Sequence, residues 1–496
     1  MNMKLPKNLH PLYKPYGQFQ IDTIAHGVIH DFAGLLLPVG MGKTYCAANI
    51  GRWRIQNCNV NKVLVLCPAT ILQKWKEEIY KFSGHNSNIL HHPTKQKRTE
   101  IIKDFISNET KYGLINYEAL PIYFNLLKQI PIDMIIADES SRYIKNLVSS
   151  QRNEDGIFKL VKRTHSAILL GDLAKFKLIL TGTLITSKPL DIWSQFKFLD
   201  GGLTFGINYY SWRNTFFNKV NYPGYTKWEI KREMIPLLHR MIYSICIRFE
   251  KSDVMKDLPE SIYSLIPIPL EGGLKRTYQK LQKKIISEIE TMEGSTSVNI
   301  TNIFTKLIRL QQVTSGFIKG DDGGIRELKQ QPKLKAVLEE IDTILASSES
   351  VIIWCKFRPT IKMISNALTS WGVKHTVMTG SDNPKQKANK WQGFQRSKTI
   401  NIFIGQVVAG GIGIELFKID TTDKYQHILF VENTFVLDHR MQALGRNEQR
   451  IGQNANCRIV DFIVKDSIDE RIMEVIKQDK EVSDMIMKGG IRKFLT

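Results

Sequence analysis

Short, largely apolar runs separated by amphipathic segments recur through the first 200 residues. They lie at Ala33–Leu37, Val63–Cys67, Gly113–Asn116, Ile132–Ala137 and Lys177–Leu180. Continuous rather than alternating apolar character favours strands that are buried on both faces. Because helical patterns separate these runs, the sequence predicts an α/β unit built on a parallel sheet.

The same pattern returns late in the chain. The later runs lie at Val351–Cys355, His375–Met378, Ile400–Ile404, Ile428–Glu432 and Arg458–Val464. A chain of 496 residues is long enough for two or three domains with separate cores. We therefore predict a second parallel-sheet α/β unit.

Between the two units the texture changes. Aromatic and charged residues crowd together at helical spacing over 201–330, which predicts a mostly helical insertion. One strand is expected near Ser261–Leu270, and the glycine-rich stretch 320–331 is expected to be a surface loop or linker. The predicted domains are the first unit over 1–200, the insertion over 201–330, the second unit over 331–465 and a C-terminal segment over 466–496.

Charge narrows the choice of partner. Lys and Arg number 69 and Asp and Glu number 48, which leaves a net charge of +21. This surplus favours a polyanion such as nucleic acid, although solubility or an anionic membrane surface also fits the charge alone. Apolar runs stay well short of the roughly 20 residues that span a bilayer, and the N-terminus lacks the apolar core of a secretory signal. We expect a cytoplasmic protein without a membrane partner.

Cysteine spacing gives no sign of a metal site or a disulfide framework. The six cysteines are scattered, and none forms a C-x-x-C pair. Reduced thiols agree with an intracellular location.

The strongest local motif is LPVGMGKT at 37–44, which lies between an apolar strand and a helical stretch. Glycines in such a loop let backbone N–H groups face phosphates, and the helix N-terminus adds positive potential. The lysine then bridges the β- and γ-phosphates, and the threonine ligates Mg²⁺. Leu37 departs from the strict motif, which has glycine there. The predicted nucleotide-binding residues of the loop are Gly40, Met41, Gly42, Lys43 and Thr44.

Two further groups suit the same chemistry. Asp138 and Glu139 end a predicted strand, where Asp138 would hold Mg²⁺ and Glu139 would orient and deprotonate the attacking water. Arg446 and Arg450 are four residues apart, so on a helix they share one face and can reach a γ-phosphate. Taken alone, an acidic pair at a strand end is more often structural, and two helical arginines are more often solvated.

These motifs together carry a family resemblance. GMGKT, DES (138–140), LILTGT (178–183), AGGIGIEL (409–416) and QALGRNEQRIGQ (442–453) stand in the order of helicase superfamily two. Narrower features resemble the Snf-type DNA translocases over roughly residues 12 to 485. They are TGTLITSKPLDIWSQFKFLD (181–200), IRFEKSDVMKDLPE (247–260), KLIRLQQVTSGF (306–317) and the tail at 450–481.

The resemblance implies two RecA-like lobes, a helical insertion and a C-terminal helix over 466–496 that braces the lobes. It implies a DNA-dependent ATPase that uses ATP and Mg²⁺ and translocates on double-stranded or branched DNA. ATP contacted by Lys43 and Arg450 would favour closure of the lobes, and hydrolysis would release it. A protein partner for targeting is not identifiable from the sequence.

Further roles are carried over from the family motifs. Gln20 matches the adenine-reading glutamine, with Gln18 as the alternative, and Gly413 of AGGIGIEL (409–416) is also expected to bind ATP. The residues that couple nucleotide state to DNA grip are Thr181, Gly182, Thr183 and Gln442. The residues expected to face DNA are Pro68, Ala69, Lys74, Asn116, Tyr117, Lys356, Thr379, Gly380, Gly410 and Gly411.

Three departures from the family pattern leave alternatives open. Ser141 replaces the histidine of D-E-A-H, Leu184 replaces the proline after T-G-T, and one extra residue separates Arg446 from Arg450. A branch-migration or fork-remodelling helicase shares every motif, and the motor of a restriction or defence complex would need partner chains. A degenerate ATPase that serves as a DNA-binding scaffold is the non-enzymatic alternative.

Overall fold

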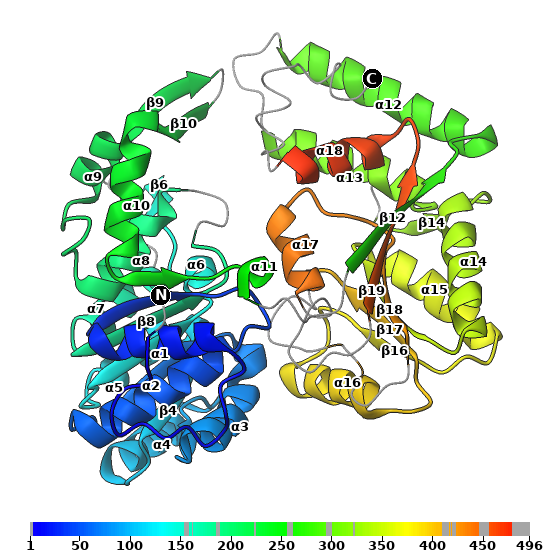
Figure 1. Cartoon of the computed structure of the whole chain (residues 1–496). Helices are drawn as coiled ribbons and strands as arrows, with labels where there is room; N and C mark the ends of the chain where they lie inside the picture. Colours follow the sequence, from blue (N-terminus) through cyan, green and yellow to red (C-terminus); the bar gives the residue numbers. More distant parts are fainter. Residues whose placement is uncertain are drawn as a thin grey trace. The chain divides into compact units, whose positions relative to one another are not determined.

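The chain folds into two compact units. Unit 1 comprises Met1–Val220 and Lys227–Asp257, and unit 2 comprises Asn221–Thr226 and Leu258–Thr496. Each is an α/β structure with its own sheet (Figure 1). The computed structural model describes residues 3–152, 158–160, 162–184, 189–222, 225–254, 261–293, 300–320, 323–408, 416, 418, 423–445 and 456–478.

Unit 1 is built on a parallel sheet whose described strands follow the order β11-β1-β8-β5-β2-β4-β3. The five strands predicted in this region are present, with ends shifted by one or two residues. Two short edge strands, β3 and β11, were not predicted. The strands are β1 (Phe32–Leu36), β2 (Val63–Cys67), β3 (Ser87–Ile89), β4 (Tyr112–Asn116), β5 (Met134–Asp138), β8 (Phe176–Thr181) and β11 (Cys246–Arg248).

Helices cover this sheet, and two short hairpins extend from unit 1. The helix α1 packs on α2 and α2 packs on α3, while α7 packs on both α5 and α8. The elements are α1 (Gln18–Ile29), α2 (Lys43–Asn57), η1 (Ala69–Ile71), α3 (Leu72–Ser83), α4 (Lys95–Ser107), η2 (Tyr117–Ala119), α5 (Leu120–Leu127), α6 (Ser140–Tyr143), β6 (Val148–Arg152), β7 (Phe158–Leu160), α7 (Lys162–Gly171), α8 (Asp191–Asp200), α9 (Tyr209–Phe216), β9 (Phe217–Tyr222), β10 (Tyr225–Ile230), η3 (Arg232–Met234), α10 (Ile235–Tyr243) and α11 (Lys251–Val254).

The predicted insertion at 201–330 is divided between the two units. Its first part packs onto α8 through an aromatic cluster, in which Phe205, Trp212 and Phe216 join Trp193 and Phe196. These rings are at most 6% exposed, so the segment that precedes β11 is part of the core of unit 1. Its second part begins with β12 (Ser261–Ile268), which fulfils the prediction of a strand near Ser261–Leu270 and pairs with the sheet of unit 2.

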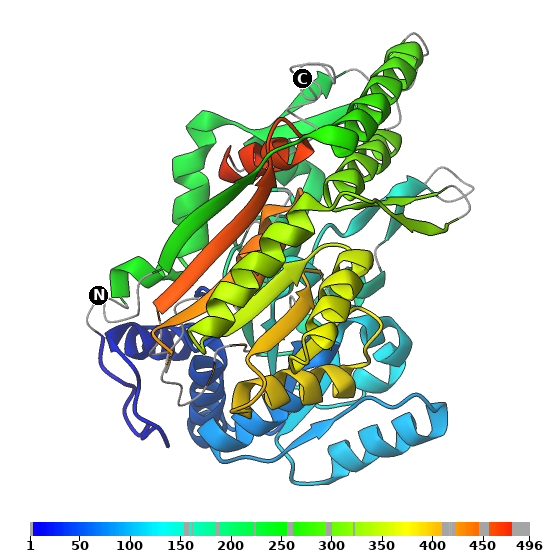
Figure 2. The same cartoon turned by 90° about the vertical axis from the view of Figure 1, so that its right-hand side faces the viewer.

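Unit 2 is built on a second parallel sheet of order β12-β19-β18-β15-β17-β16. Figure 2 looks onto this unit, where β12 (green) runs beside β19 (orange-red). The described elements are α12 (Gly272–Glu293), α13 (Ile300–Thr314), β13 (Phe317–Lys319), β14 (Ile325–Glu327), α14 (Pro332–Ala346), β15 (Ser350–Cys355), α15 (Arg358–Ser370), β16 (His375–Met378), α16 (Pro384–Arg396), β17 (Ile402–Gln406), β18 (Tyr425–Phe430), α17 (Leu437–Leu444), β19 (Asn456–Val464) and α18 (Ile468–Gln478).

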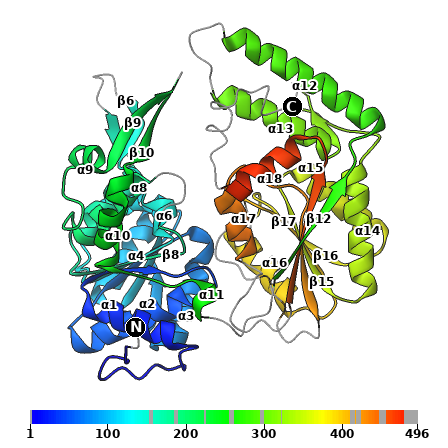
Figure 3. The same ribbon diagram turned by 45° about the horizontal axis from the view of Figure 1, so that its top comes forward.

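A buried ion pair ties three helices of unit 2 together. Lys333 of α14 is 1% exposed and pairs with Asp469 of α18, which is 3% exposed. The other oxygen of Asp469 accepts a hydrogen bond of 3.1 Å from Thr314 of α13. Figure 3 shows α18 beside α13. The helix α18 is therefore fastened to α13, the helix that contains most of KLIRLQQVTSGF (306–317).

Removing only the cation of this pair is expected to destabilise unit 2 strongly. Lys333→Met leaves Asp469 buried without a counter-charge, which typically costs about 3–5 kcal/mol. Lys335→Met is the matched control, because Lys335 lies on the same helix with a 79% exposed side chain and a surface pair to Glu339. Denaturant unfolding followed by circular dichroism measures both. Equal losses in the two variants would contradict the assigned importance of the buried pair.

Candidate functional site

The phosphate-binding loop predicted at 37–44 lies between β1 and α2. Gly40 and Gly42 adopt left-handed backbone conformations, with φ of 91° and 80°. A side chain at Gly42 would also bring a Cβ to 2.5 Å from the Nε2 atom of Gln20. Positive φ favours glycine at both positions, since other residues disfavour it, and the close contact is a second reason at Gly42. The loop places Lys43 and Thr44 in the first turn of α2, where main-chain N–H groups and the helix dipole favour anions.

Leu37 explains how the loop tolerates its departure from the strict motif. Its side chain is fully buried at the end of β1, and its carbonyl accepts a 2.9 Å hydrogen bond from Nζ of Lys43. The main chain at this position therefore orients the lysine whatever the side chain is. Substitution of glycine by leucine leaves the lysine in place at the start of α2.

Gln20, predicted to read the adenine, is attached to the same loop. Its side chain is buried, donates from Nε2 to the Met41 carbonyl at 3.1 Å, and accepts from the Tyr16 N–H at 2.8 Å. Gln18, the alternative, is exposed and bonds to the carbonyl of Met3. The geometry favours Gln20 as the glutamine that belongs to the nucleotide-binding loop.

Asp138 lies at the carboxyl end of β5, and several donors hold it. Its Oδ2 accepts a 2.8 Å hydrogen bond from the indole N–H of Trp75, and its Oδ1 accepts one of 2.9 Å from the N–H of Glu139. The Tyr117 hydroxyl donates to its main-chain carbonyl at 2.7 Å. Burial, and then the charge of Glu139, raise the pKa of Asp138 to about 6, while Lys43 lowers it.

Glu139, predicted to orient water, has a backbone geometry that residues other than glycine seldom adopt. Its φ is 52° and its ψ is 41°. Such left-handed residues cost free energy and cluster at functional sites. The side chain is half-buried, beside the buried Asp138. This turn places the carboxylates of Asp138 and Glu139 side by side in the chain at the carboxyl end of β5.

Ser141 makes a direct connection to the predicted coupling motif. Its hydroxyl lies 2.7 Å from the hydroxyl of Thr181, which also bonds to the Thr183 carbonyl at 2.8 Å. Gly182 lies against the phosphate loop, since a Cβ added to it would be 3.4 Å from the Cα of Pro38. The serine that replaces the usual histidine thus links the acidic motif to the T-G-T motif inside unit 1.

Leu184, the second departure, is held from two sides. Its side chain packs against the aromatic core cluster of unit 1. Its carbonyl accepts a 2.9 Å hydrogen bond from Gln195, whose other amide atom accepts from Ser140 at 3.0 Å. These contacts fix the chain after the T-G-T motif, where the family pattern has proline.

The DNA-facing residues predicted in unit 1 lie at the carboxyl ends of β2 and β4. Ala69 is exposed, Pro68 is buried, and Lys74 is half-buried beside Glu78 at 3.6 Å. Asn116 is buried with an Oδ1 that has no hydrogen-bond partner among the described residues. The Tyr117 ring is fully buried, and its hydroxyl donates to the main-chain carbonyl of Asp138.

The described counterparts in unit 2 also lie at strand ends. Lys356 follows β15, and its Nζ donates to Gln311 at 2.5 Å. Burial lowers the pKa of Lys356 to about 8, against opposing effects of Glu432 and Asp469. Thr379 and Gly380 follow β16, and the Gly380 N–H donates to Gln406 at 3.2 Å.

Gln442 lies on α17, whose attachment was not foreseen from the sequence. Arg440 of that helix is buried and makes two hydrogen bonds to Asp461, of 2.6 and 2.7 Å, and one of 2.6 Å to Asn433. Since a lone arginine in a helix usually points to solvent, the sequence carries no signal for this anchor. The remaining predicted residues, Gly410, Gly411, Gly413, Arg446 and Arg450, lie outside the described residues.

Trp75 is the other residue that sequence reasoning passed over. It stands at an inward position of α3, where an apolar residue is expected, and only the fold shows that its N–H meets Asp138. Among the described residues no group of three or more His, Cys, Asp or Glu is placed to hold a metal ion. No described helix combines the length and the apolar character needed to cross a membrane.

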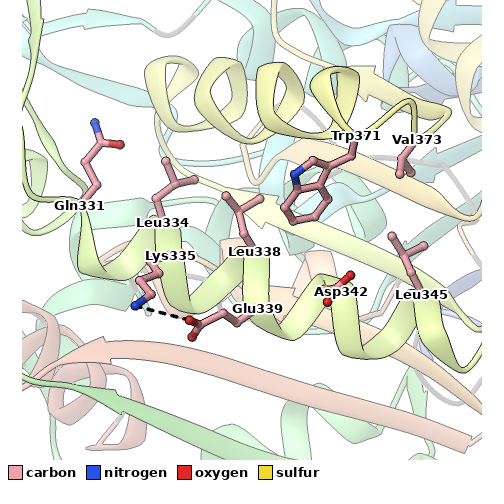
Figure 4. Close-up of a pocket in the computed structure, with 9 residues that line it drawn as sticks. All are labelled: Gln331, Leu334, Lys335, Leu338, Glu339, Asp342, Leu345, Trp371 and Val373. Atoms are coloured by element: carbon pink, nitrogen blue, oxygen red, sulfur yellow. Dashed lines mark ion pairs between the residues drawn. The ribbon is translucent and has the colours of Figure 1, made fainter.

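A separate groove of 780 Å³ lies on unit 2, away from the predicted residues. Leucines of α14, namely Leu334, Leu338 and Leu345, form its apolar floor with Trp371 and Val373 at the end of α15 (Figure 4). It contains none of the residues that the sequence assigned to nucleotide or DNA.

The family model described as the SNF2-related domain matches residues 30–316. This range is 316 − 30 + 1 = 287 of 496 residues, which is more than half of the chain. It contains the phosphate loop, the acidic motif and the T-G-T motif.

Similar proteins include helicases of bacteria and animals. The chain is 24% identical over 470 residues to an uncharacterised ATP-dependent helicase of Mycoplasma genitalium, covering 94% of this chain and 41% of that protein. It is 22% identical to the chromodomain-helicase-DNA-binding protein 1-like of Mus musculus, covering 91% of this chain and 47% of that protein. The chain thus spans less than half the length of these two relatives.

Among solved structures, one that is similar is the SWI2/SNF2 ATPase core of Sulfolobus solfataricus in complex with double-stranded DNA. The TM-score is 0.43 at 19% identity, covering 98% of this chain and 96% of that chain. Because the SNF2-related domain model matches more than half of the chain, and the chain has two parallel-sheet α/β units, it belongs to the SNF2-related domain family.

Proposed function

We propose that this protein is a translocase that couples ATP hydrolysis in unit 1 to movement along double-stranded DNA. The observation that carries the proposal is the assembly of Lys43, Asp138 and Thr181 at one edge of the unit 1 sheet, each already held by neighbours. A degenerate scaffold would have no need to hold these three groups in place.

The chain's own residues have separate tasks in this proposal. Lys43 neutralises charge on the β- and γ-phosphates, and the N–H groups of the loop and of the first turn of α2 hold the phosphate oxygens. Glu139 orients the attacking water and accepts its proton. Thr181 relays the state of the site to the loop that contains Thr183, through its bonds to both Ser141 and that loop.

Magnesium fits the available donors. The Thr44 hydroxyl and the Asp138 carboxylate are hard oxygen ligands, and Mg²⁺ prefers one or two such groups together with phosphate oxygens and water. When bound, the ion neutralises charge that develops on the transferred phosphoryl group. Arg446 and Arg450 are proposed to add positive charge at the γ-phosphate, with Arg450 as the more important of the two.

Duplex DNA is the proposed track because phosphate contacts are sufficient to follow it. The net charge of +21 supports such contacts, and they carry little sequence information. Relatives named as helicases, one of them also as DNA-binding, point the same way. The proposed contacts are Pro68, Ala69, Lys74, Asn116, Tyr117, Lys356, Thr379, Gly380, Gly410 and Gly411.

Substitution at the nucleotide site should separate hydrolysis from DNA binding. Lys43→Ala is expected to abolish ATP hydrolysis and to leave DNA affinity near that of the wild type, because Lys43 contacts only the nucleotide in the proposed scheme. Glu139→Gln is expected to retain ATP without turnover. Phosphate release and DNA gel shifts measure these effects, with the exposed Lys103→Ala as the control. Near-normal turnover in both site variants would exclude the assignment.

Movement on duplex DNA is expected without separation of its strands. Strand separation would cost about 1.4 kcal/mol per base-pair step. ATP should therefore drive displacement of a third strand bound in the major groove, while a forked duplex is unwound poorly. The Lys43→Ala variant serves as the inactive control. Efficient unwinding of the fork without triplex displacement would instead favour a branch-migration or fork-remodelling helicase, and DNA binding without phosphate release would favour a scaffold.

Lys356 gives the DNA interaction an expected pH dependence. A lysine with a pKa of about 8 is charged at pH 7 and largely neutral at pH 9, so its attraction to phosphate fades as pH rises through this window. Lys356→Arg keeps its charge because the arginine pKa exceeds about 12. Fluorescence anisotropy with duplex DNA between pH 7 and 9 should show affinity falling more steeply for the wild type than for the variant. Parallel curves would remove Lys356 from the set of DNA contacts.

A further inference from the structure

Asp138 is held by donors from two different segments of unit 1. Trp75 reaches its carboxylate from α3 and Tyr117 reaches its carbonyl from η2, with hydrogen bonds of 2.8 and 2.7 Å. Both donors are buried to within 1% of full enclosure. Water therefore cannot replace either bond, and displacement of either segment acts directly on Asp138.

These two segments are also the ones expected to touch DNA in unit 1. Trp75 directly follows Lys74 on α3. The short helix η1, which begins at Ala69 after Pro68, leads directly into α3. Tyr117 directly follows Asn116, whose buried Oδ1 lacks a partner among the described residues. Lys74 is thus next in the chain to the residue that holds the Asp138 carboxylate, and Asn116 is next to the residue that holds the Asp138 main-chain carbonyl.

Rigid packing makes such a connection effective. The Tyr117 ring is stacked on Tyr143, with ring centres 4.6 Å apart and planes 3° from parallel. Trp75 is among the largest fully buried side chains of the chain. Since close-packed interiors transmit small shifts rather than absorb them, movement of α3 or η2 carries over to the carboxylate.

We infer that Trp75 and Tyr117 are positioning residues through which bound DNA orients Asp138 and so makes ATP hydrolysis depend on DNA. This inference rests on the proposed function and names the regulation of that same site. In it, phosphate contacts at Lys74 or Asn116 shift α3 or η2, and the two hydrogen bonds move Asp138 into register for the Mg²⁺ that accompanies ATP.

The test compares ATP turnover of the full chain with and without saturating duplex DNA in Trp75→Phe and Tyr117→Phe. Phenylalanine keeps an aromatic ring and removes the donor. The ratio of DNA-saturated to DNA-free kcat should fall roughly tenfold in Trp75→Phe, the scale of one hydrogen bond to a charged group. The DNA concentration for half-maximal stimulation should stay unchanged in Trp75→Phe, because Trp75 is not among the proposed DNA contacts. Tyr117→Phe should lower the ratio in the same direction.

Trp212→Phe is the matched control in the same unit. Trp212 is 3% exposed, and its indole N–H has no partner among the described residues, so the substitution changes packing without removing a hydrogen bond. Its ratio should equal that of the wild type. A purely structural role of Trp75 would lower both rates equally and leave the ratio unchanged, which would overturn the inference.

Tyr117→Phe keeps the inference testable if Trp75→Phe fails to fold. An unchanged ratio in folded Tyr117→Phe then overturns it. Absence of DNA stimulation in the wild type would overturn the proposed function together with the inference. An unchanged ratio in the variants beside a stimulated wild type overturns the inference alone.

Discussion

Burying a carboxylate at the end of β5 costs free energy that its neighbours must offset. Asp138 is 6% exposed, and its pKa is raised by burial and by Glu139. An indole N–H and a main-chain N–H stabilise its charge, and Lys43 provides the opposite charge nearby. The surrounding groups thus offset part of the cost of burying this charge. The phosphate loop, helix α3 and the acidic motif each contribute a group that stabilises this carboxylate.

Unit 2 also buries a carboxylate just after the carboxyl end of a strand of its sheet. Glu432 follows β18, is 1% exposed, and has its pKa raised by burial. It accepts hydrogen bonds from the Lys356 N–H at 2.9 Å and from the Thr360 hydroxyl at 2.6 Å. The buried Lys333, which is paired with Asp469, also favours its charge. Here the buried carboxylate organises backbone and helices, since a strand end, α15 and α14 converge on it.

The pattern of apolar residues predicted most strands of the two sheets, but it did not predict the short edge strands or how the insertion packs. Ten strands of the two parallel sheets were recognisable because a parallel sheet buried on both faces demands a continuous apolar run, as at Val63–Cys67. Edge strands such as Ser87–Ile89 are short and carry no such demand. The insertion at 201–330 appeared as one helical body in the sequence. Its aromatic residues, among them Trp212, instead complete the core of unit 1.

The candidate site followed a similar rule. Residues whose chemistry depends on local sequence, such as Gly42 and Lys43, were identified from the motif, because a phosphate loop is one continuous stretch of chain. Residues that act through a tertiary contact were missed. Trp75 and Arg440 meet partners 63 and 21 positions away, at Asp138 and Asp461. No pattern along the chain records which buried ring will face which carboxylate.

At the departures from the family pattern, long-range contacts hold the chain where the usual residue type is missing. Ser141 is too short to act as the histidine of D-E-A-H does, yet its hydroxyl reaches Thr181 at 2.7 Å within the same unit. Leu184 lacks the fixed φ of proline, but Gln195 holds its carbonyl and the core holds its side chain. In both places a long-range contact supplies the constraint that a local residue type supplies elsewhere. The sequence therefore departs from the motif, while a hydrogen bond still connects the acidic motif to the T-G-T loop.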